Sequence, residues 1–194
     1  MRNTTIAVCF LGLLLGTTRQ AQAQAETYKV DPVHTMVLFR IKHLGVSYTH
    51  GRLNDISGRF TIDTANPAAS KVELEIKAAS IDTNDAKRDQ HLKGPDFFNV
   101  KQFPRITFKS TSMTRTDDAK DLWEVKGDLS LHGVTKEITV KVERVGAGKD
   151  PWGGYRSGAE MVFTIKRSDY KMNYMEGAIG DEVRLTVAVE GIRQ

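Results

Sequence analysis

The sequence predicts an all-β protein: an antiparallel eight-stranded barrel with one short helix and a lid loop. Apolar and polar residues alternate with a period of two along most of the chain, and short turn-forming stretches separate the alternating runs. These connections are too short for the crossovers that parallel strands need, so we expect antiparallel pairing. A barrel leaves no free sheet edge, and eight strands enclose just enough space for packed side chains or one small ligand.

Residues 1–25 have the pattern of a secretory signal peptide. Arg2 precedes an apolar run from Ile6 to Gly16, and two Ala-Gln-Ala sequences end this region. The run is shorter than the roughly 20 residues that span a bilayer. We therefore expect secretion across the inner membrane to the periplasm, cleavage near residues 23–25, and a single barrel domain over residues 26–194.

The composition of the mature chain excludes several classes of protein. The only cysteine, Cys9, lies in the signal segment, so disulfides and thiolate metal sites are not expected. The full sequence has 28 Lys and Arg against 24 Asp and Glu, and Arg2 and Arg19 of the signal segment leave 26 against 24 in the mature chain. These charges alternate closely instead of forming a basic patch. We expect no nucleic-acid partner.

Each expected strand has one apolar face. The clearest run places Val72, Leu74, Ile76 and Ala78 opposite four charged residues. The other inward faces are predicted to be Val37, Phe39, Ile41 and His43; Phe60 and Ile62; Ile106 and Phe108; Trp123, Val125, Leu129 and Leu131; Ile138, Val140 and Val142; Ala159, Met161, Phe163 and Ile165; and Val183, Leu185, Val187 and Val189. Gly127 interrupts its run, which suggests a bend or a bulge.

The stretch from Arg88 to Thr111 breaks the strand pattern and is interpreted as a lid. A helix is expected from Asp85 to Lys93, with Asn84 as N-cap, an Asp89–Lys93 ion pair, and Gly94-Pro95 as its end. Nine residues are too few for an isolated helix, so it must dock on the barrel. Leu92, Phe97 and Phe98 supply the apolar surface for this docking.

The inward stripe and the lid together define the candidate ligand-binding residues. Period-two aromatic and aliphatic residues are typical of a filled core as well as of a ligand wall, and both interpretations stay open. The candidates are Phe39, Ile41, His43, Phe60, Ile76, Leu92, Phe97, Phe98, Phe108, Trp123, Leu129, Met161, Phe163 and Leu185.

The sequence contains none of the common catalytic or metal-binding motifs. The sequence has no nucleophile elbow, phosphate loop or dinucleotide fingerprint, so no catalytic residue and no required cofactor is predicted. The mature histidines are scattered without metal-ligand spacing, and no metal site is predicted. We expect His43 to be a hydrogen-bonded histidine on the core face and His132 to be a turn residue. The mature histidines are His34, His43, His50, His91 and His132.

Basic residues gather around the lid. Arg88, His91, Lys93 and Arg105 could receive an anionic or carbonyl-bearing head group, although a solvated helix face explains them equally well and is favoured. Asp89 and His91 are the only close acid and imidazole, and their spacing on a helix points them apart.

A set of motifs, in order along the mature chain, resembles the YceI-like family of secreted, lipocalin-like proteins. Each motif is weak by itself, but together they are specific. They are Tyr28-x-Val30-Asp31-Pro32-x-His34, Arg88-Asp89-x-His91-Leu92 with Phe97-Phe98, Pro104 with Thr107-Phe108-Lys109-Ser110-Thr111, Gly127-Asp128-Leu129 with Leu131-His132-Gly133-Val134-Thr135, and Asp150-Pro151-Trp152-Gly153-Gly154.

The resemblance implies an extended eight-stranded barrel in the periplasm, whose elongated apolar cavity holds a polyisoprenoid such as an isoprenoid quinone or a prenyl lipid. It implies no catalytic residues. The sequence departs from a common form of the family after Arg167-Ser168-Asp169-Tyr170, where Lys171 replaces a glycine and a segment rich in Met and Tyr follows.

The sequence therefore leaves three hypotheses for the function of the protein. The favoured one is a periplasmic protein that carries or sequesters a polyisoprenoid, as a monomer or a dimer, with transient membrane contact. The second is a small-molecule enzyme or metal protein with a site near the helix at 88–93. The third is a filled barrel that binds a partner through its surface.

Overall fold

The computed structural model describes residues 25–194, so the expected signal peptide lies outside the described residues apart from Ala25. The strands are β1 (Glu26–Val30), β2 (Met36–His43), β3 (Ser47–Leu53), β4 (Ile56–Ile62), β5 (Lys71–Lys77), β6 (Ile81–Asp82), β7 (Arg105–Asp117), β8 (Leu122–Leu131), β9 (Val134–Lys149), β10 (Tyr155–Lys166) and β11 (Ile179–Arg193). The helices are α1 (Ala86–Leu92) and the 3₁₀ turns η1 (Pro67–Ala69), η2 (Ala78–Ser80) and η3 (Ser168–Tyr170).

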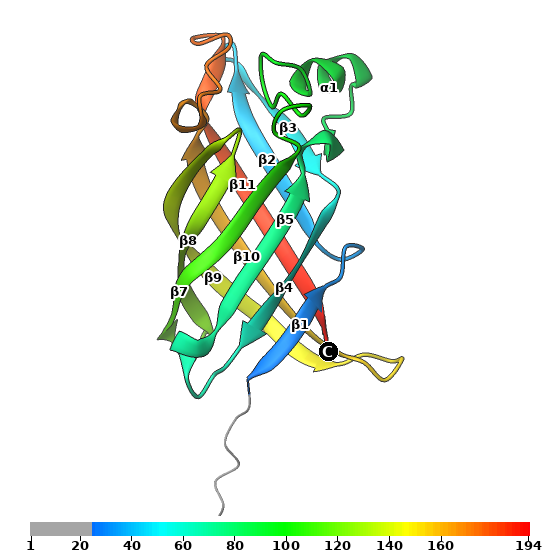
Figure 1. The fold of residues 1–194 in the computed structure, drawn as a ribbon, viewed down its shortest axis with the longest axis vertical. Helices are drawn as coiled ribbons and strands as arrows, with labels where there is room; N and C mark the ends of the chain where they lie inside the picture. Colours follow the sequence, from blue (N-terminus) through cyan, green and yellow to red (C-terminus); the bar gives the residue numbers. More distant parts are fainter. Residues whose placement is uncertain (1–24) are drawn as a thin grey trace, which may run out of the picture.

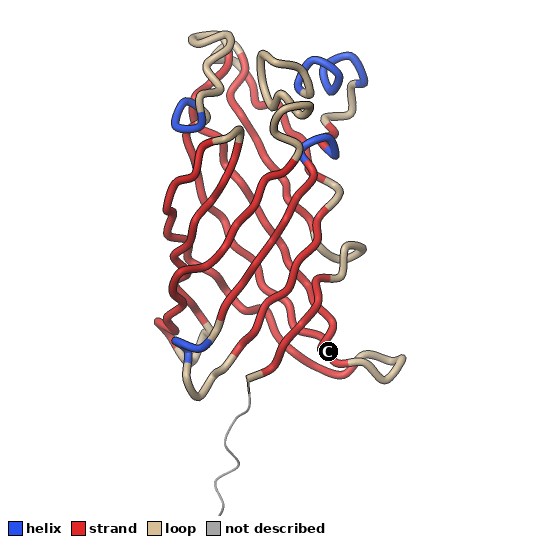
Figure 2. Tube along the Cα trace, in the orientation of Figure 1, coloured by secondary structure: helices blue, strands red, loops and turns tan. Residues whose placement is uncertain are grey.

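The eleven strands build one closed antiparallel barrel with eight strand positions around its circumference (Figures 1 and 2). We call each position a stave, because some positions are shared by two consecutive short strands. Both β1 and β2 pair with β11, so they form a single stave that is broken at residues 31–35. Their neighbours β4 and β3 form the second stave, and β5 continues through η2 into β6 as the third. The predicted eight-stranded antiparallel barrel is therefore confirmed.

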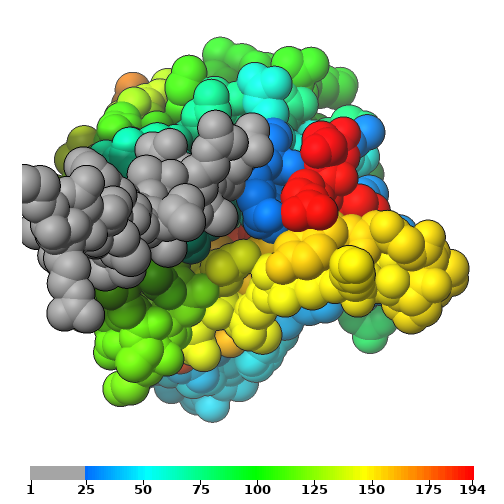
Figure 3. Space-filling view, turned by 90° about the horizontal axis from the view of Figure 1, so that it is seen from below, coloured from blue at the N-terminus to red at the C-terminus, as the bar shows by residue number. Residues whose placement is uncertain are grey.

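Pairing of the first strand with the last closes the barrel. Tyr28 lies opposite Arg193 and Val30 opposite Gly191, and the view from below shows the two chain segments side by side (Figure 3). A side chain at Gly191 would not fit, because its Cβ would lie 2.6 Å from the ring of Phe60. The missing side chain thus allows the two strands to close over a packed aromatic ring.

The charged residues of the alternating runs lie on the outer surface, as predicted. Glu73 on β5 pairs with Arg59 at 3.1 Å and with Lys109 at 3.4 Å, on the strands to either side. Exposed ion pairs of this kind contribute little to stability, so the inward apolar face determines the fold.

The end of the barrel that carries the β7–β8 turn is filled by side chains. Trp123 is 2% exposed and packs with Met113, Val125 and Val140. Its Nε1 donates a 2.9 Å hydrogen bond to Asp121 in the turn. We call this the closed end, because side chains occupy the interior here.

Gly127 lies at a β-bulge, as the sequence suggested. The β7–β8 register shifts between Ser110 and Ser112, opposite Gly127. A Cβ at this position would come within 2.5 Å of both the Lys109 carbonyl oxygen and the Phe108 ring. The glycine therefore allows close approach of two backbones where the sheet bends.

Gly58 on β4 is the glycine with the strictest requirement. Its φ is +150°, and a Cβ would overlap the backbone carbonyl oxygen of Glu73 on the neighbouring strand. We predict that Gly58→Ala lowers the free energy of unfolding by about 3 kcal/mol, through overpacking and backbone strain. Urea denaturation measures the change. Gly146→Ala, where nothing lies within 4 Å, is the control and should change stability by less than about 0.5 kcal/mol.

Arg156 on β10 ties together two of the family-like motifs. Its guanidinium lies 2.6 Å from Asp31, 2.6 Å from Glu190 and 3.0 Å from Asp150. Asp31 follows β1, whereas Asp150 begins the β9–β10 loop and accepts hydrogen bonds from the backbone of Trp152 and Gly154. This network fixes the break in the first stave against the last two strands.

Hydrogen bonds from His34 and Arg156 lower the pKa of Asp31 from 3.8 to about 2. The folded state thus binds a proton less readily than the unfolded chain, and the stability from this carboxylate is complete above about pH 5 and is lost as pH falls through 3.8 towards 2. We predict that the difference in unfolding free energy between wild type and Asp31→Asn is largest near neutral pH and shrinks over this range. Urea titrations at several pH values measure it, with Asp128→Asn, at an exposed site on β8, as control. A difference that is constant from pH 7 to pH 2 would contradict this account.

Candidate ligand-binding cavity

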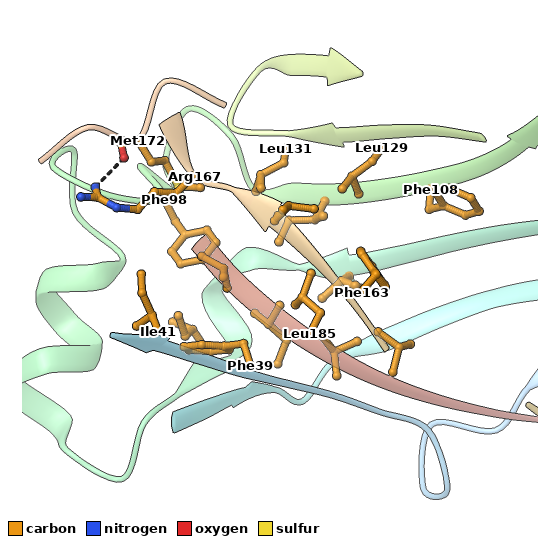
Figure 4. A pocket seen from close by; sticks show the side chains of 18 of the residues that line it. Phe39, Ile41, Phe98, Phe108, Leu129, Leu131, Phe163, Arg167, Met172 and Leu185 are labelled. Carbon is orange, nitrogen blue, oxygen red and sulfur yellow. Dashed lines mark hydrogen bonds between the residues drawn. The ribbon is translucent and has the colours of Figure 1, made fainter. Parts of the chain in front are cut away.

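An apolar cavity of about 240 Å³ occupies the half of the barrel away from the closed end. Its wall comes from all eight staves and from the lid, and Figure 4 shows Arg167 near one end and Phe108 near the other. Lys42 and His43, which are exposed at the end of β2, belong to the wall. The cavity therefore reaches the surface at this end, which we call the mouth.

The structure brings most of the predicted site residues together around this cavity. Two of them, Phe97 and Phe98, come from the lid, and both line the cavity, as expected for a loop that carries both rings inward. The predicted residues in the wall are Phe39, Ile41, His43, Ile76, Leu92, Phe97, Phe98, Phe108, Leu129, Met161, Phe163 and Leu185.

Phe60 and Trp123 point inward as predicted but lie outside the cavity. Phe60 stacks on Tyr28 with ring centroids 5.0 Å apart, and Trp123 fills the closed end. Period-two alternation shows on which face of a strand a residue lies, but not how far along the barrel axis. These two rings form the floor below the cavity instead of its wall.

His43 was expected to be a hydrogen-bonded residue of the core and is instead exposed at the mouth. It is the last residue of β2, so the strand runs out of the core before reaching it. His132 lies in the β8–β9 turn as predicted, with φ +50°, and its Nδ1 is 2.9 Å from the Tyr170 carbonyl oxygen.

Several wall residues escaped the sequence prediction because their strands lack alternation. Leu53 and Ile56 flank the break in the second stave, whose first part is largely polar, and Ile81 lies on the two-residue strand β6. A lone apolar residue beside an Asn-Asp turn is a weak signal. The inward direction of these residues follows from the barrel itself.

The helix of the lid is α1, and its cap differs from the prediction. Asp85, and not Asn84, is the N-cap, and its side chain accepts a 2.8 Å hydrogen bond from the Arg88 backbone N–H. Asn84 has φ +61° and belongs to the preceding turn. Asp89 does not pair with Lys93 but accepts hydrogen bonds from the backbone and hydroxyl of Thr83. The helix is thereby anchored to the end of β6.

The lid consists of α1 and the loop that continues to Pro104, because β7 already begins at Arg105. Its mouth-side contact is an aromatic cluster. Tyr174, from the loop before β11, lies 5.3 Å from the ring of Phe97 and 5.4 Å from the ring of His91. We call these contacts the aromatic seam, since they join the lid to the loop at residues 171–178.

Arg167 is the functional element that the sequence prediction did not single out. It is 4% exposed, its stem lines the cavity, and its guanidinium donates to the carbonyl oxygens of four residues. These are Gly180 at 2.9 Å, Met172 at 2.5 Å, Tyr174 at 2.8 Å and Ile179 at 3.1 Å. Figure 4 shows the guanidinium turned towards this loop and away from the apolar interior. Arg167 thus shapes one side of the mouth.

We predict that Arg167→Lys lowers the free energy of unfolding by about 3 kcal/mol, because an ammonium group cannot reach four carbonyl oxygens and leaves buried acceptors unpaired. Urea denaturation measures the loss. Arg52→Lys is the matched control: Arg52 makes an exposed ion pair with Asp82 at 2.9 Å, and its replacement should cost less than about 0.5 kcal/mol. Equal losses in the two variants would show that Arg167 is not an organising residue.

Lys171 follows η3 with φ +60°, in the left-handed region that favours glycine. The sequence predicted a departure from the family pattern at this position. The loop at residues 171–178 closes back onto Arg167.

The ionisable side chains of the wall belong to basic residue types. They are Lys42, His43, Arg88 and Arg167, and the wall contains no Asp or Glu. Near α1, the side chains of Asp89 and His91 turn to different partners, since Asp89 bonds Thr83 and His91 lies 2.9 Å from Asp96. The structure thus does not bring Asp89 and His91 together, and the acid beside His91 is Asp96 of the following loop.

A second group of potential metal ligands lies outside the cavity. Asp31, His34 and Glu190 place ligand atoms within 4.8 Å of one another. Arg156 already lies 2.6 Å from both carboxylates. The Arg156 guanidinium therefore already supplies the positive charge that these two carboxylates would otherwise obtain from a metal ion.

Within residues 25–194, none of the helices is both long enough and apolar enough to span a membrane.

The comparison with known proteins decides the family. The family model of the YceI-like domain matches residues 28–191. The chain belongs to the YceI-like family. It is 45% identical to the UPF0312 protein of Pseudomonas aeruginosa strain LESB58 over 196 residues, which covers 100% of both chains. The resemblance predicted from the sequence motifs is thus confirmed.

Two solved structures share the fold. BcnA from Burkholderia cenocepacia superposes with a TM-score of 0.74 at 24% identity, over 83% of this chain and 98% of BcnA. A polyisoprenoid-binding domain from Saccharophagus degradans superposes with a TM-score of 0.64 at 17% identity, over 86% of this chain and 98% of that domain. At these identities the similarity shows the YceI-like barrel, and not the ligand.

Proposed function

We propose that the protein is a periplasmic binding protein that holds a polyisoprenoid, such as an isoprenoid quinone or a prenyl lipid, in its cavity for carriage or sequestration. The observation that carries the proposal is the cavity wall, which is apolar between a basic mouth and an aromatic floor. A volume of about 240 Å³ is below the roughly 300–1,000 Å³ of pockets for drug-sized ligands and favours a slender chain. The fold shared with a polyisoprenoid-binding domain supports the same ligand class.

The energetics of such a ligand are sufficient without a charged binding site. Burial of one CH₂ contributes about 0.8 kcal/mol, so an isoprene unit contributes about 3 to 4 kcal/mol. Association costs about 4 to 15 kcal/mol, so about three buried units, roughly what a cavity of about 240 Å³ holds, reach micromolar binding at the low end of that cost. The wall needs only to exclude water and to fit the shape of the ligand's hydrocarbon chain. This function requires no catalytic group.

Organic-solvent extraction of the purified protein, followed by mass spectrometry, tests the proposal directly. We expect a co-purifying isoprenoid, or uptake of an added isoprenoid quinone by protein that has been stripped of lipid. Absence of both would refute the proposal.

A cavity-filling variant tests the location of the ligand. Leu185 on β11 faces the cavity, and Leu185→Trp should weaken binding of geranylgeraniol at least about tenfold, because displacing two CH₂ groups costs about 1.6 kcal/mol. Arg184→Trp places the same ring at the adjacent exposed position and should bind like the wild type. Fluorescence displacement assays compare the three proteins. Equal affinities would place the ligand elsewhere.

A further inference from the structure

Exposed apolar side chains gather at the mouth. Leu44 is 57% and Val46 83% exposed on the β2–β3 turn, and Tyr48 is 51% exposed at the start of β3. Tyr174 is 40% and Met175 46% exposed on the loop at residues 171–178. The two loops are joined, because the Leu44 backbone N–H donates to the Ala178 carbonyl oxygen at 2.7 Å. We call these five residues the mouth patch.

The backbone holds two of these side chains outward in an unfavourable conformation. Leu44 has φ +50° and Met175 has φ +53°, in the left-handed region where glycine is favoured. Neither side chain belongs to the buried core, since Leu44 is 57% and Met175 46% exposed. Large apolar residues at two strained, exposed turn positions mark a surface that something covers.

The mouth patch is continuous with the cavity. His43, which precedes Leu44, and Ile179, which pairs with His43, both line the cavity. Tyr174 packs against Phe97, another wall residue, at 5.3 Å. A hydrocarbon chain that leaves the cavity therefore meets apolar side chains at the rim.

The charges around the mouth fit an anionic surface. Lys42 is exposed at the end of β2, and the guanidinium of Arg40 lies 4.5 Å over the Tyr48 ring. Lys171 is exposed at the start of the second loop, which also carries one acid, Glu176. Tyrosines among apolar residues, with basic groups beside them, are the composition that binds at the interface of an anionic bilayer.

We propose that the mouth patch docks on the surface of an anionic phospholipid bilayer, so that the ligand chain moves between membrane and cavity without crossing water. The docking itself stands on the exposed residues alone. The transfer of a chain rests on the proposed function.

Sedimentation with phospholipid vesicles tests the docking. The wild type should bind vesicles that contain phosphatidylglycerol and bind phosphatidylcholine vesicles more weakly. Val46→Asp should lower partitioning into the anionic vesicles at least about tenfold, and Met175→Asp on the other loop should act in the same direction. The control is Val145→Asp. Val145 is 72% exposed on β9. It lies at the closed end, since the backbone N–H of the adjacent Arg144 donates to the Asp121 carbonyl oxygen there. The variant is therefore far from the mouth patch and should sediment like the wild type.

A second measurement separates docking from ligand binding. Farnesol supplied from solution, without vesicles, should bind the wild type and Val46→Asp equally, which also shows that the variant is folded. The docking would be overturned if the wild type did not sediment with anionic vesicles. It would also be overturned if Val46→Asp and Met175→Asp both sedimented like the wild type. Failure of farnesol to bind a wild type that does sediment would overturn the proposed ligand and leave the docking in place.

Discussion

Pairing of β1 with β11 leaves the sheet without a free edge between its first and last staves, and the arrangement of the interior follows from this closure. Once the sheet is closed, every second residue of each stave must point into the same enclosed space. The glycine at 191 makes the pairing sterically possible, and the Arg156 network fixes the break in the first stave beside it. Neither feature belongs to the cavity, yet both support the closure that encloses it.

The sequence predicted the inward direction of most cavity residues, but not their position along the barrel axis. Alternation is a local property of a strand, so it assigned Phe39 and Trp123 to the same inner surface. Only the register of all strands shows that Phe39 lines the cavity while Trp123 fills the closed end. For the same reason His43 was expected in the core, although its strand ends at the mouth.

The role of Arg167 is set by backbone positions that the sequence does not specify. An isolated arginine between an alternating strand and a polar turn is typical of a surface residue. Its burial becomes favourable because one guanidinium meets four carbonyl oxygens of a loop that turns back over it. A similar limit applies to the helix cap, since Asn84 and Asp85 both suit an N-cap and only the turn geometry selects Asp85.

The two sides of the mouth are held by interactions of different strength. Four charge-assisted hydrogen bonds from Arg167 hold the loop at residues 171–178 to the barrel, each contributing about 1.5 to 3 kcal/mol. The lid is anchored to Thr83 at one end and meets that loop through the aromatic seam, whose contacts contribute about 0.5 to 1.5 kcal/mol each. The seam is therefore a weaker attachment than the bonds of Arg167. The loop that carries Tyr174 and Met175 is thus held to the barrel more firmly than it is held to the lid.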